Sequence, residues 1–207
     1  MLGSYSTSYI APNLSQLFGP FGANPDLKPE ENTTAEAGFE LQSGNFRVSG
    51  LYFNRKEENF IIFGSNGYVN TAETVTVSGI EAEVTAKPVE NIQLDANYTF
   101  IENTTTTALR IPRHKLNAAA LFTIAENTTA SLRYQYTSER SDIDFVSFEN
   151  TELDSFSLVD LHFSHALQNK KMKIFININN IFNTNYVELV GYTTKGTNIR
   201  LGFLITI

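Results

Sequence analysis

The sequence contains no cysteine, and its basic residues never gather into a long run. Without cysteine, the chain has neither a disulfide framework nor a thiolate metal site. Lys and Arg total 15 against 22 Asp and Glu, which gives a formal net charge of −7. A nucleic-acid-binding protein needs a basic stripe to meet phosphates, and the longest candidate is NKKMK at 169–173. The composition therefore argues against nucleic acid as a partner.

Long apolar runs are also missing from the sequence. No window holds 18 consecutive apolar residues, so no transmembrane helix is predicted. The first ten residues, MLGSYSTSYI, lack the charged and apolar regions of a signal peptide. We therefore expect either a cytosolic protein or a piece of a longer exported chain.

The three histidines do not predict a metal site. His162 and His165 are three residues apart in a predicted strand, which places them on opposite faces of a sheet. His114 stands at a predicted strand start, where a surface position is expected. Asp160 and Ser164 share a strand face with His162, but such neighbours lie about 6–7 Å apart, so a Ser–His–acid hydrolase is not predicted. The residues thus predict no enzyme and no cofactor.

A two-residue alternation of apolar and polar side chains dominates the chain from about residue 33 onward. In the clearest segment, Ile199, Leu201 and Phe203 alternate with Asn198 and Arg200. The alternation predicts an all-β antiparallel fold and no long helix. We expect about nine or ten strands, the first a short optional one near 3–10. The others are near 33–42, 45–58, 73–87, 91–101, 113–125, 129–138, 155–167, 171–180 and 197–207.

The connections between these predicted strands alternate in length. Short turns are predicted at 43–45, 87–91, 125–129 and 168–171, and long loops at 11–32, 59–72, 102–112, 139–154 and 181–196. Short turns at one rim and long loops at the other are typical of an up-and-down transmembrane β-barrel of the outer membrane.

A soluble β-sandwich that serves as a binding or adhesion module is the alternative, because its strands also alternate. Strands of ten or more residues favour the barrel, since strands of soluble proteins average about 5–6 residues. Charged side chains opposite apolar ones also favour it, as in a water-filled lumen. These charged residues are Arg47, Arg55, Asp95, Arg133, Asp160 and Arg200.

Residues 9–31, YIAPNLSQLFGPFGANPDLKPEE, form a passage rich in proline and glycine. Pro25 fixes its own φ and disfavours the α conformation at Asn24, and Pro29 does the same at Lys28. Within the passage, NPDLKPE at 24–30 is therefore predicted to be a rigid, extended, helix-free connection. A structural role is favoured over direct contact with a ligand.

Four passages, in order along the chain, resemble those of TonB-dependent outer-membrane receptors. They are YIAPNLSQLFG…NPDLKPE followed by GFE, VSGIEAEV at 77–84, NINNIFNTNYVE at 177–188, and GYTTKGTNIRLGFLITI at 191–207. The family motif loop comprises Asn24, Pro25, Leu27, Pro29 and Glu30. Within the family, APNLSQLFG and YVELVGYTTKG are most similar to the vitamin B12 (cobalamin) receptor branch.

The resemblance implies that 1–207 are the C-terminal half of a 22-stranded barrel, about 9–10 strands, without the plug domain and the N-terminal strands. It implies a location in the bacterial outer membrane, in contact with its lipid. It also implies active uptake of a scarce large nutrient without covalent chemistry. Cobalamin is the first candidate and a ferric siderophore the second. The TonB–ExbB–ExbD complex would act through the absent N-terminal part.

Aromatic residues in the predicted long loops are the candidates for ligand contact, because a large flat ligand gains from apolar contact at a loop rim. The candidates are Phe18, Phe21, Phe63, Tyr68, Phe145, Phe148, Tyr186 and Tyr192. Haem receptors of the family place a histidine between passages like YIAP and NPDL. Residues 9–27 contain none, which argues against haem as the substrate.

Overall fold

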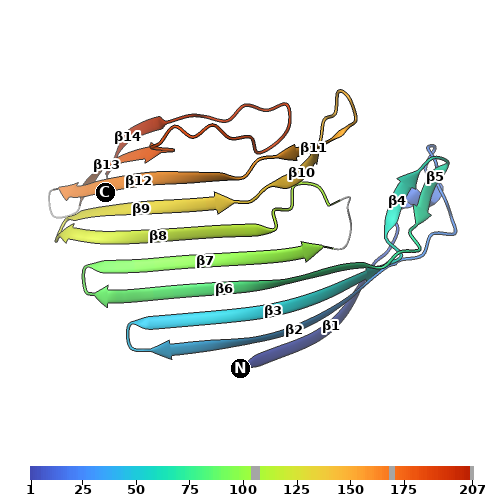
Figure 1. The fold of residues 1–207 in the computed structure, drawn as a ribbon, viewed down its shortest axis with the longest axis horizontal. Helices are drawn as coiled ribbons and strands as arrows, with labels where there is room; N and C mark the ends of the chain where they lie inside the picture. Colours follow the sequence, from blue (N-terminus) through green and yellow to red (C-terminus); the bar gives the residue numbers. More distant parts are fainter. Residues whose placement is uncertain (104–107, 168–170, 206–207) are drawn as a thin grey trace. The chain divides into compact units, whose positions relative to one another are not determined.

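The computed structural model describes residues 1–103, 108–167 and 171–205. Its main feature is a single antiparallel sheet of ten strands (Figure 1). In sheet order these are β1 (Leu2–Ile10), β2 (Glu30–Ser43), β3 (Phe46–Glu58), β6 (Val75–Val89), β7 (Ile92–Asn103), β8 (His114–Ala125), β9 (Thr128–Thr137), β12 (Phe156–Leu167), β13 (Met172–Asn179) and β14 (Asn198–Ile205).

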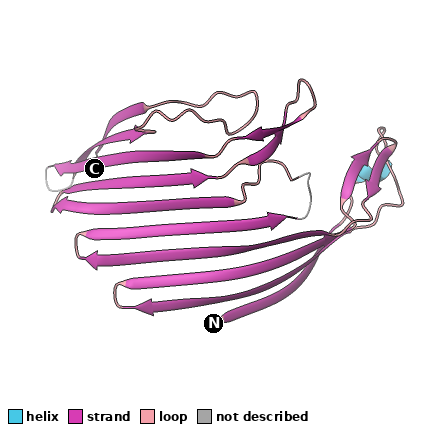
Figure 2. Cartoon of the chain, viewed as in Figure 1, coloured by secondary structure: helices cyan, strands magenta, loops and turns pink. Residues whose placement is uncertain are grey.

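Each of the ten predicted strands is present, and the all-β antiparallel prediction is confirmed. Strands occupy most of the chain in Figure 2. The predicted turn at 168–171, the predicted loop at 102–112 and the end of the predicted strand 197–207 lie partly outside the described residues.

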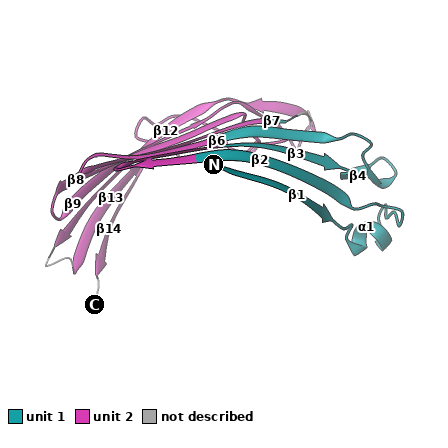
Figure 3. Cartoon of the chain, turned by 90° about the horizontal axis from the view of Figure 1, so that it is seen from below, with its two compact units in different colours: residues 1–39, 51–80, 102–107 teal, residues 40–50, 81–101, 108–207 magenta. Residues whose placement is uncertain are grey.

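The chain divides into two compact units (Figure 3). Unit 1 comprises residues 1–39, 51–80 and 102–107, and unit 2 comprises residues 40–50, 81–101 and 108–207. Unit 1 holds β1 and the connection that follows it, whereas unit 2 holds β8, β9 and β12–β14.

One face of the sheet in unit 2 is polar. Asp95 pairs with Ala119, which in turn pairs with Arg133, and Arg133 pairs with Asp160. Cross-strand partners share a face, so these charged side chains stand on one surface, which we call the lumen face. His162 continues this surface towards β13 and β14 through Asn177 and Arg200.

The opposite face of the same sheet is apolar and uncovered. Leu132 pairs with Leu161, and Ile176 pairs with Leu201. Leu132 and Leu201 nevertheless remain 42% and 78% exposed. The alternative of a β-sandwich is therefore wrong, because the main strands form one sheet, and no second sheet of the described residues packs against its apolar face. Such a face suits contact with lipid.

The predicted short turns are present in unit 2. Gly44–Asn45 joins β2 to β3, Glu90–Asn91 joins β6 to β7, and Glu126–Asn127 joins β8 to β9. Gly44 has a φ of 54°, a left-handed conformation that glycine adopts readily. The predicted alternation of short turns and long connections is thus confirmed for these strands.

The long connections contain more structure than the alternation predicts. Residues 59–72 hold the hairpin β4 (Ile61–Gly64) and β5 (Gly67–Asn70), and residues 139–154 hold β10 (Arg140–Ile143) and β11 (Asn150–Leu153). These strands are too short for alternation to reveal them.

A short helix, α1 (Leu14–Phe18), was also not predicted. Asn13 caps it, because the Gln16 amide donates to Asn13 Oδ1 (2.9 Å) and the Asn13 amide donates to Gln16 Oε1 (2.8 Å). A helix with the length and hydrophobicity of a membrane span does not occur in the part of the chain that the structure describes.

Candidate ligand-binding loops

Loop assembly 1, within unit 1, consists of residues 11–29 and the hairpin β4–β5. The Tyr68 amide donates to the carbonyl of Gly22 (2.8 Å), and Asn24 Nδ2 donates to the carbonyl of Tyr68 (3.0 Å). The Asn70 side chain accepts from the Lys28 amide (2.8 Å) and donates to the Lys28 carbonyl (3.0 Å). The proline-rich connection is therefore attached along the length of β5.

Two glycines allow the backbones of loop assembly 1 to meet. Gly22 and Gly67 have φ angles of 62° and 125°. A Cβ atom on Gly67 would lie 2.4 Å from the Gly22 carbonyl oxygen, and a Cβ atom on Gly22 would lie 2.7 Å from Gly67 Cα. A larger residue at either position would thus force the two segments apart. We call this contact the glycine clasp.

The family motif loop is helix-free, as predicted, but it is not fully extended. Pro25 and Asp26 form a turn, in which Asn24 Oδ1 accepts from the Asp26 amide (3.0 Å). A proline favours such a turn because its φ is already fixed, and asparagine caps the turn with its side chain.

The remaining motif residues connect this turn to the fold. Leu27 is buried, and Glu30 accepts a hydrogen bond from the Ile61 amide (2.8 Å). Pro29 precedes β2 directly. These contacts are structural, and a ligand-binding role for Asn24, Pro25, Leu27, Pro29 and Glu30 stays a prediction.

Loop assembly 1 gathers the first four predicted ligand-contact aromatics. Phe18, at the end of α1, and Phe21 are 71% and 80% exposed. The Tyr68 ring is partly buried and meets the exposed Phe63 ring edge to face, with the centroids 5.0 Å apart. The Phe63 ring also lies against Gly22. The glycine clasp therefore holds the rings of Phe63 and Tyr68 in place within loop assembly 1.

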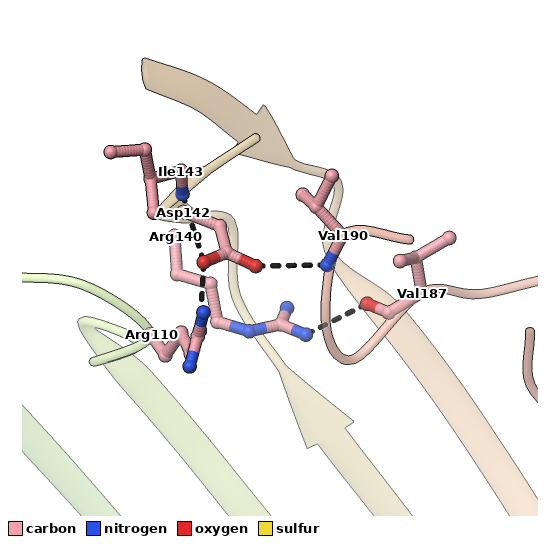
Figure 4. Close-up of polar contacts among 6 residues, drawn as sticks. All are labelled: Arg110, Arg140, Asp142, Ile143, Val187 and Val190. Atoms are coloured by element: carbon pink, nitrogen blue, oxygen red, sulfur yellow. Dashed lines mark hydrogen bonds and ion pairs between the residues drawn. The ribbon is translucent and has the colours of Figure 1, made fainter. Parts of the chain in front are cut away.

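Loop assembly 2, within unit 2, consists of residues 108–113, residues 138–155 with the hairpin β10–β11, and residues 180–197. Asp142 lies at its centre and has no exposed surface (Figure 4). Asp142 Oδ1 accepts from Arg110 Nε (2.7 Å) and from the Ile143 amide (2.9 Å). Asp142 Oδ2 accepts from the Val190 amide (2.9 Å). One carboxylate therefore joins all three segments.

Asp142 keeps its charge in this buried position. Burial by itself raises the pKa of the carboxyl, but the hydrogen bonds from the Val190 and Ile143 amides and from Arg110 outweigh that effect. The pKa of Asp142 is consequently held below the ordinary value of 3.8.

Arg140 attaches the hairpin to the last loop. Its Nη2 donates to the Val187 carbonyl (2.8 Å), as Figure 4 shows. The guanidinium carbon lies 5.3 Å from the centre of the Phe156 ring, and that ring lies 4.7 Å from the Tyr186 ring. Arg140 Nη1 is buried and has no hydrogen-bond partner among the described residues. Arg140, Phe156 and Tyr186 thus form one stack.

A cavity of about 540 Å³ lies beside this stack. Two of the predicted aromatics, Tyr186 and Tyr192, help to line it. The pKa of Tyr186 is raised by burial and then by the charges of Glu188 and Asp160, so the phenol is neutral at physiological pH. The complete lining is Glu152, Leu153, Asp154, Ser155, Asn185, Tyr186, Val187, Tyr192, Thr193 and Thr194.

The other two predicted aromatics lie elsewhere in loop assembly 2. Phe145 and Phe148 are 62% and 74% exposed between β10 and β11, and neither lines the cavity. Arg110 lies over the Phe145 ring at 5.7 Å. The structure thus brings Tyr186 and Tyr192 to the same cavity and leaves Phe145 and Phe148 outside it.

Sequence reasoning missed the polar residues of loop assembly 2. Arg110, Arg140 and Asp142 hold its segments together, and Glu152 and Asp154 line the cavity. The acids stand in the predicted loop 139–154, but nothing in their spacing indicates which of them is buried.

The three candidate hydrolase residues bind other partners. Asp160 Oδ1 accepts from the Asn180 amide (2.8 Å), His162 pairs with Asn177, and Ser164 pairs with Thr129 (2.9 Å). Across the described residues, no group of three or more His, Asp or Glu side chains could hold a metal ion.

The sheet, its polar and apolar faces and its long loops define a class of protein, the outer-membrane β-barrel. The family model described as "TonB dependent receptor-like, beta-barrel" matches residues 1–181. The chain therefore belongs to the TonB-dependent receptor family, as its motifs indicate. The family consists of outer-membrane transport receptors rather than enzymes.

Curated relatives include the vitamin B12 transporter BtuB of Vibrio cholerae. It is 29% identical over 198 residues, which cover 91% of this chain and 32% of the relative. The chain thus spans about a third of the length of the curated relatives that it matches.

Solved structures with the same fold include siderophore receptors. The pyoverdine receptor FpvA of Pseudomonas aeruginosa has a TM-score of 0.79 at 18% identity, with 97% of this chain and 30% of that one covered. The ferric-catecholate import receptor Fiu of E. coli K12 has a TM-score of 0.79 at 17% identity, with 97% and 32% covered. At these identities the likeness supports the fold alone.

Proposed function

We propose that this chain is the C-terminal part of the barrel of a longer receptor that takes up a scarce nutrient too large for porins. Cobalamin is the first candidate substrate. One observation carries this choice, the likeness to vitamin B12 transporters over 91% of the chain. Uptake is driven by the TonB–ExbB–ExbD complex, which acts on parts of the receptor outside this chain.

The ligand-contact residues in this proposal belong to both loop assemblies. In loop assembly 1 they are Phe18, Phe21 and Tyr68, and in loop assembly 2 they are Tyr186 and Tyr192, which line the cavity. Phe145 and Phe148 serve as outer contacts, because their rings are exposed. Exposed aromatic rings favour a large, partly apolar ligand, since they gain buried area at a small loss of conformational entropy.

A ferric siderophore is the second candidate substrate. The exposed rings of Phe18 and Phe21 would also suit aromatic catecholate groups, and Fiu, which has the same fold, is described as a ferric-catecholate import receptor. Cobalamin ranks first because the relatives that are named for it are more similar in sequence.

Calorimetric titration of the detergent-solubilised full-length receptor with cyanocobalamin tests the proposal. We expect submicromolar binding, weakened several-fold by Phe21→Ala because an apolar contact is lost. The matched control is Phe46→Ala, which removes an exposed ring beside the turn after β2. No binding of cyanocobalamin at micromolar concentration, together with tight binding of a ferric siderophore, would reverse the order of the candidates.

A further inference from the structure

We infer that the cavity of loop assembly 2 binds a ligand group that carries N–H donors, a primary amide or an ammonium, and discriminates against carboxylates. This inference rests on the proposed function and deepens it. Its basis is the chemistry of the residues that line the cavity, which is acidic and rich in hydrogen-bond acceptors.

The charge of the lining has a single sign. Glu152 and Asp154 are exposed, and neither forms an ion pair with a described residue. Ionised carboxylates only accept hydrogen bonds, so these two groups need donors from water or from a ligand. No lysine or arginine is among the ten residues of the lining, all of which the structure describes.

The nearby cation is kept away from the cavity. Arg140 is only 7% exposed, donates to the Val187 carbonyl and packs on Phe156. It does not line the cavity. A negatively charged ligand group would therefore meet two carboxylates and no cation among the lining residues, and like charges at such close range are unfavourable. Lys195 is exposed and follows Thr194 in the chain, but it does not line the cavity.

The rest of the lining can orient a polar arm of a ligand. Leu153 is buried and Val187 adds a second apolar wall, while Tyr192 and Thr193 supply hydroxyl groups. The Thr194 hydroxyl donates to the Tyr186 carbonyl (2.6 Å) and so helps to hold the wall. Apolar walls with a few convergent polar groups are typical of ligand sites.

The wall of the cavity is also held in place before any ligand binds. Tyr186 stacks on Phe156, and Asp142 accepts from the Val190 amide in the same loop. Less conformational freedom is therefore lost on binding, which favours affinity.

This chemistry selects among the proposed ligands. Cobalamin carries primary amides around its corrin ring, and each amide presents two N–H donors. Hydrolysis of one amide gives a carboxylate of nearly the same size. The cavity should distinguish these two molecules through charge and hydrogen bonding rather than through shape.

The test compares cyanocobalamin with its monocarboxylic acids, each titrated into the full-length receptor. We expect the wild-type receptor to bind cyanocobalamin about tenfold more tightly, the effect of a hydrogen bond to a charged group. In the double variant Glu152→Gln, Asp154→Asn, affinity for cyanocobalamin should fall about tenfold and the preference over the acids should disappear.

The matched control is the double variant Asp144→Asn, Glu149→Gln, which removes two charges from the same connection outside the cavity. It should retain both the affinity and the preference. If the cavity variant behaves like this control while the wild-type receptor binds cyanocobalamin, the inference is overturned and the proposed function stands.

If the wild-type receptor does not bind cyanocobalamin, cobalamin fails as substrate and a second pair of probes decides the inference. Ferrioxamine B carries an ammonium group, whereas ferric citrate is anionic. A wild-type preference for ferrioxamine B that the cavity variant loses supports the inference. If the cavity substitutions change the affinity for none of these probes, the inference is overturned.

Discussion

Asp142 is a single carboxylate that joins segments more than 30 residues apart in the sequence. It accepts hydrogen bonds from Arg110, Ile143 and Val190 with no exposed surface. An ionised carboxylate can accept from all three donors, whereas an amide must direct its NH₂ group at one of them. The charge on Asp142 is therefore required for the shape of loop assembly 2.

Asp142→Asn should loosen loop assembly 2 at neutral pH. We expect amide hydrogen exchange at Ile143 and Val190 to accelerate about tenfold. In the variant, the NH₂ group of the introduced asparagine would face one of the N–H donors that now bind the carboxylate, and that hydrogen bond would be lost. Asp144→Asn is the matched control, since among the described residues the Asp144 side chain accepts from the Val146 amide alone, which an asparagine can also do. Equal exchange in the two variants would contradict the proposed role of the charge.

Because the pKa of Asp142 is lowered, the stability of loop assembly 2 should decrease at acidic pH. A carboxyl whose pKa is lower in the folded state stabilises that state fully above its ordinary pKa of 3.8 and loses the effect as pH falls through the folded value. In the wild-type protein, the rate of amide hydrogen exchange at Val190, corrected for the intrinsic rate, should therefore rise only below about pH 4. Asp142→Asn should show no such rise, and a wild-type transition near neutral pH would exclude this carboxyl as its source.

The candidate aromatics and the polar residues of the site differ in how far the sequence can predict them. Tyr186 and Tyr192 stand in a long predicted loop, and both line the cavity. Asp142 and Asp144 are two residues apart in another predicted loop, and only the former is fully buried. Its burial depends on Arg110 and Val190, distant residues whose approach no local pattern encodes.

At the scale of elements, the long loops are organised by short hairpins. The hairpin β4–β5 holds the proline-rich connection through the glycine clasp, and β10–β11 carries Asp142 and Arg140. Each hairpin is thus a support for a neighbouring irregular segment rather than part of the barrel wall.

Substitutions of two glycines in the hairpin β4–β5 distinguish the effect of the glycine clasp from the effect of changing the hairpin itself. Gly67→Ala should destabilise loop assembly 1 by about 1–3 kcal/mol, because φ is positive there and the Cβ meets the Gly22 carbonyl. Gly64→Ala, whose Cβ has no neighbour closer than 3.6 Å, should change little. Limited proteolysis of residues 11–29 in the full-length receptor measures the difference, and equal cleavage in both variants would refute the clasp.

Some of the missed elements had local signals in the sequence. Asn66–Gly67 lies between Phe63 and Tyr68, and an Asn-Gly pair is a sequence signal for a hairpin, although the turn itself is Ser65–Asn66 and Gly67 pairs with Gly64. Asn13 followed three residues later by Gln16 resembles a capping box, which marks the start of α1. The ten long strands were predictable because alternation over eight or more residues is hard to produce by chance.

At the scale of the whole molecule, the two faces of the sheet have different surroundings. The lumen face in unit 2 carries Asp95, Arg133 and Asp160, and the opposite face carries exposed Leu132 and Leu201. An outer-membrane barrel needs this difference because lipid surrounds the wall while water fills the lumen.

Neighbouring residues of β9 provide a direct test of the two faces. Leu132→Arg should destabilise the full-length receptor by about 2–4 kcal/mol if the residue lies near the middle of the bilayer, since it places a charge in lipid. Ser131→Arg, one residue away on the lumen face, should have a much smaller effect. Urea unfolding in phospholipid vesicles measures both free energies, and equal losses would contradict the assignment of the faces.

The tip of the hairpin β10–β11 offers a practical consequence. Val146 is 91% exposed there, and the chain has no cysteine of its own. A Val146→Cys variant would carry one accessible thiol, which a maleimide fluorophore could label without competition from any other cysteine of residues 1–207. Fluorescence from that position would follow the hairpin in living cells, while the buried carboxylate at its base is left unchanged.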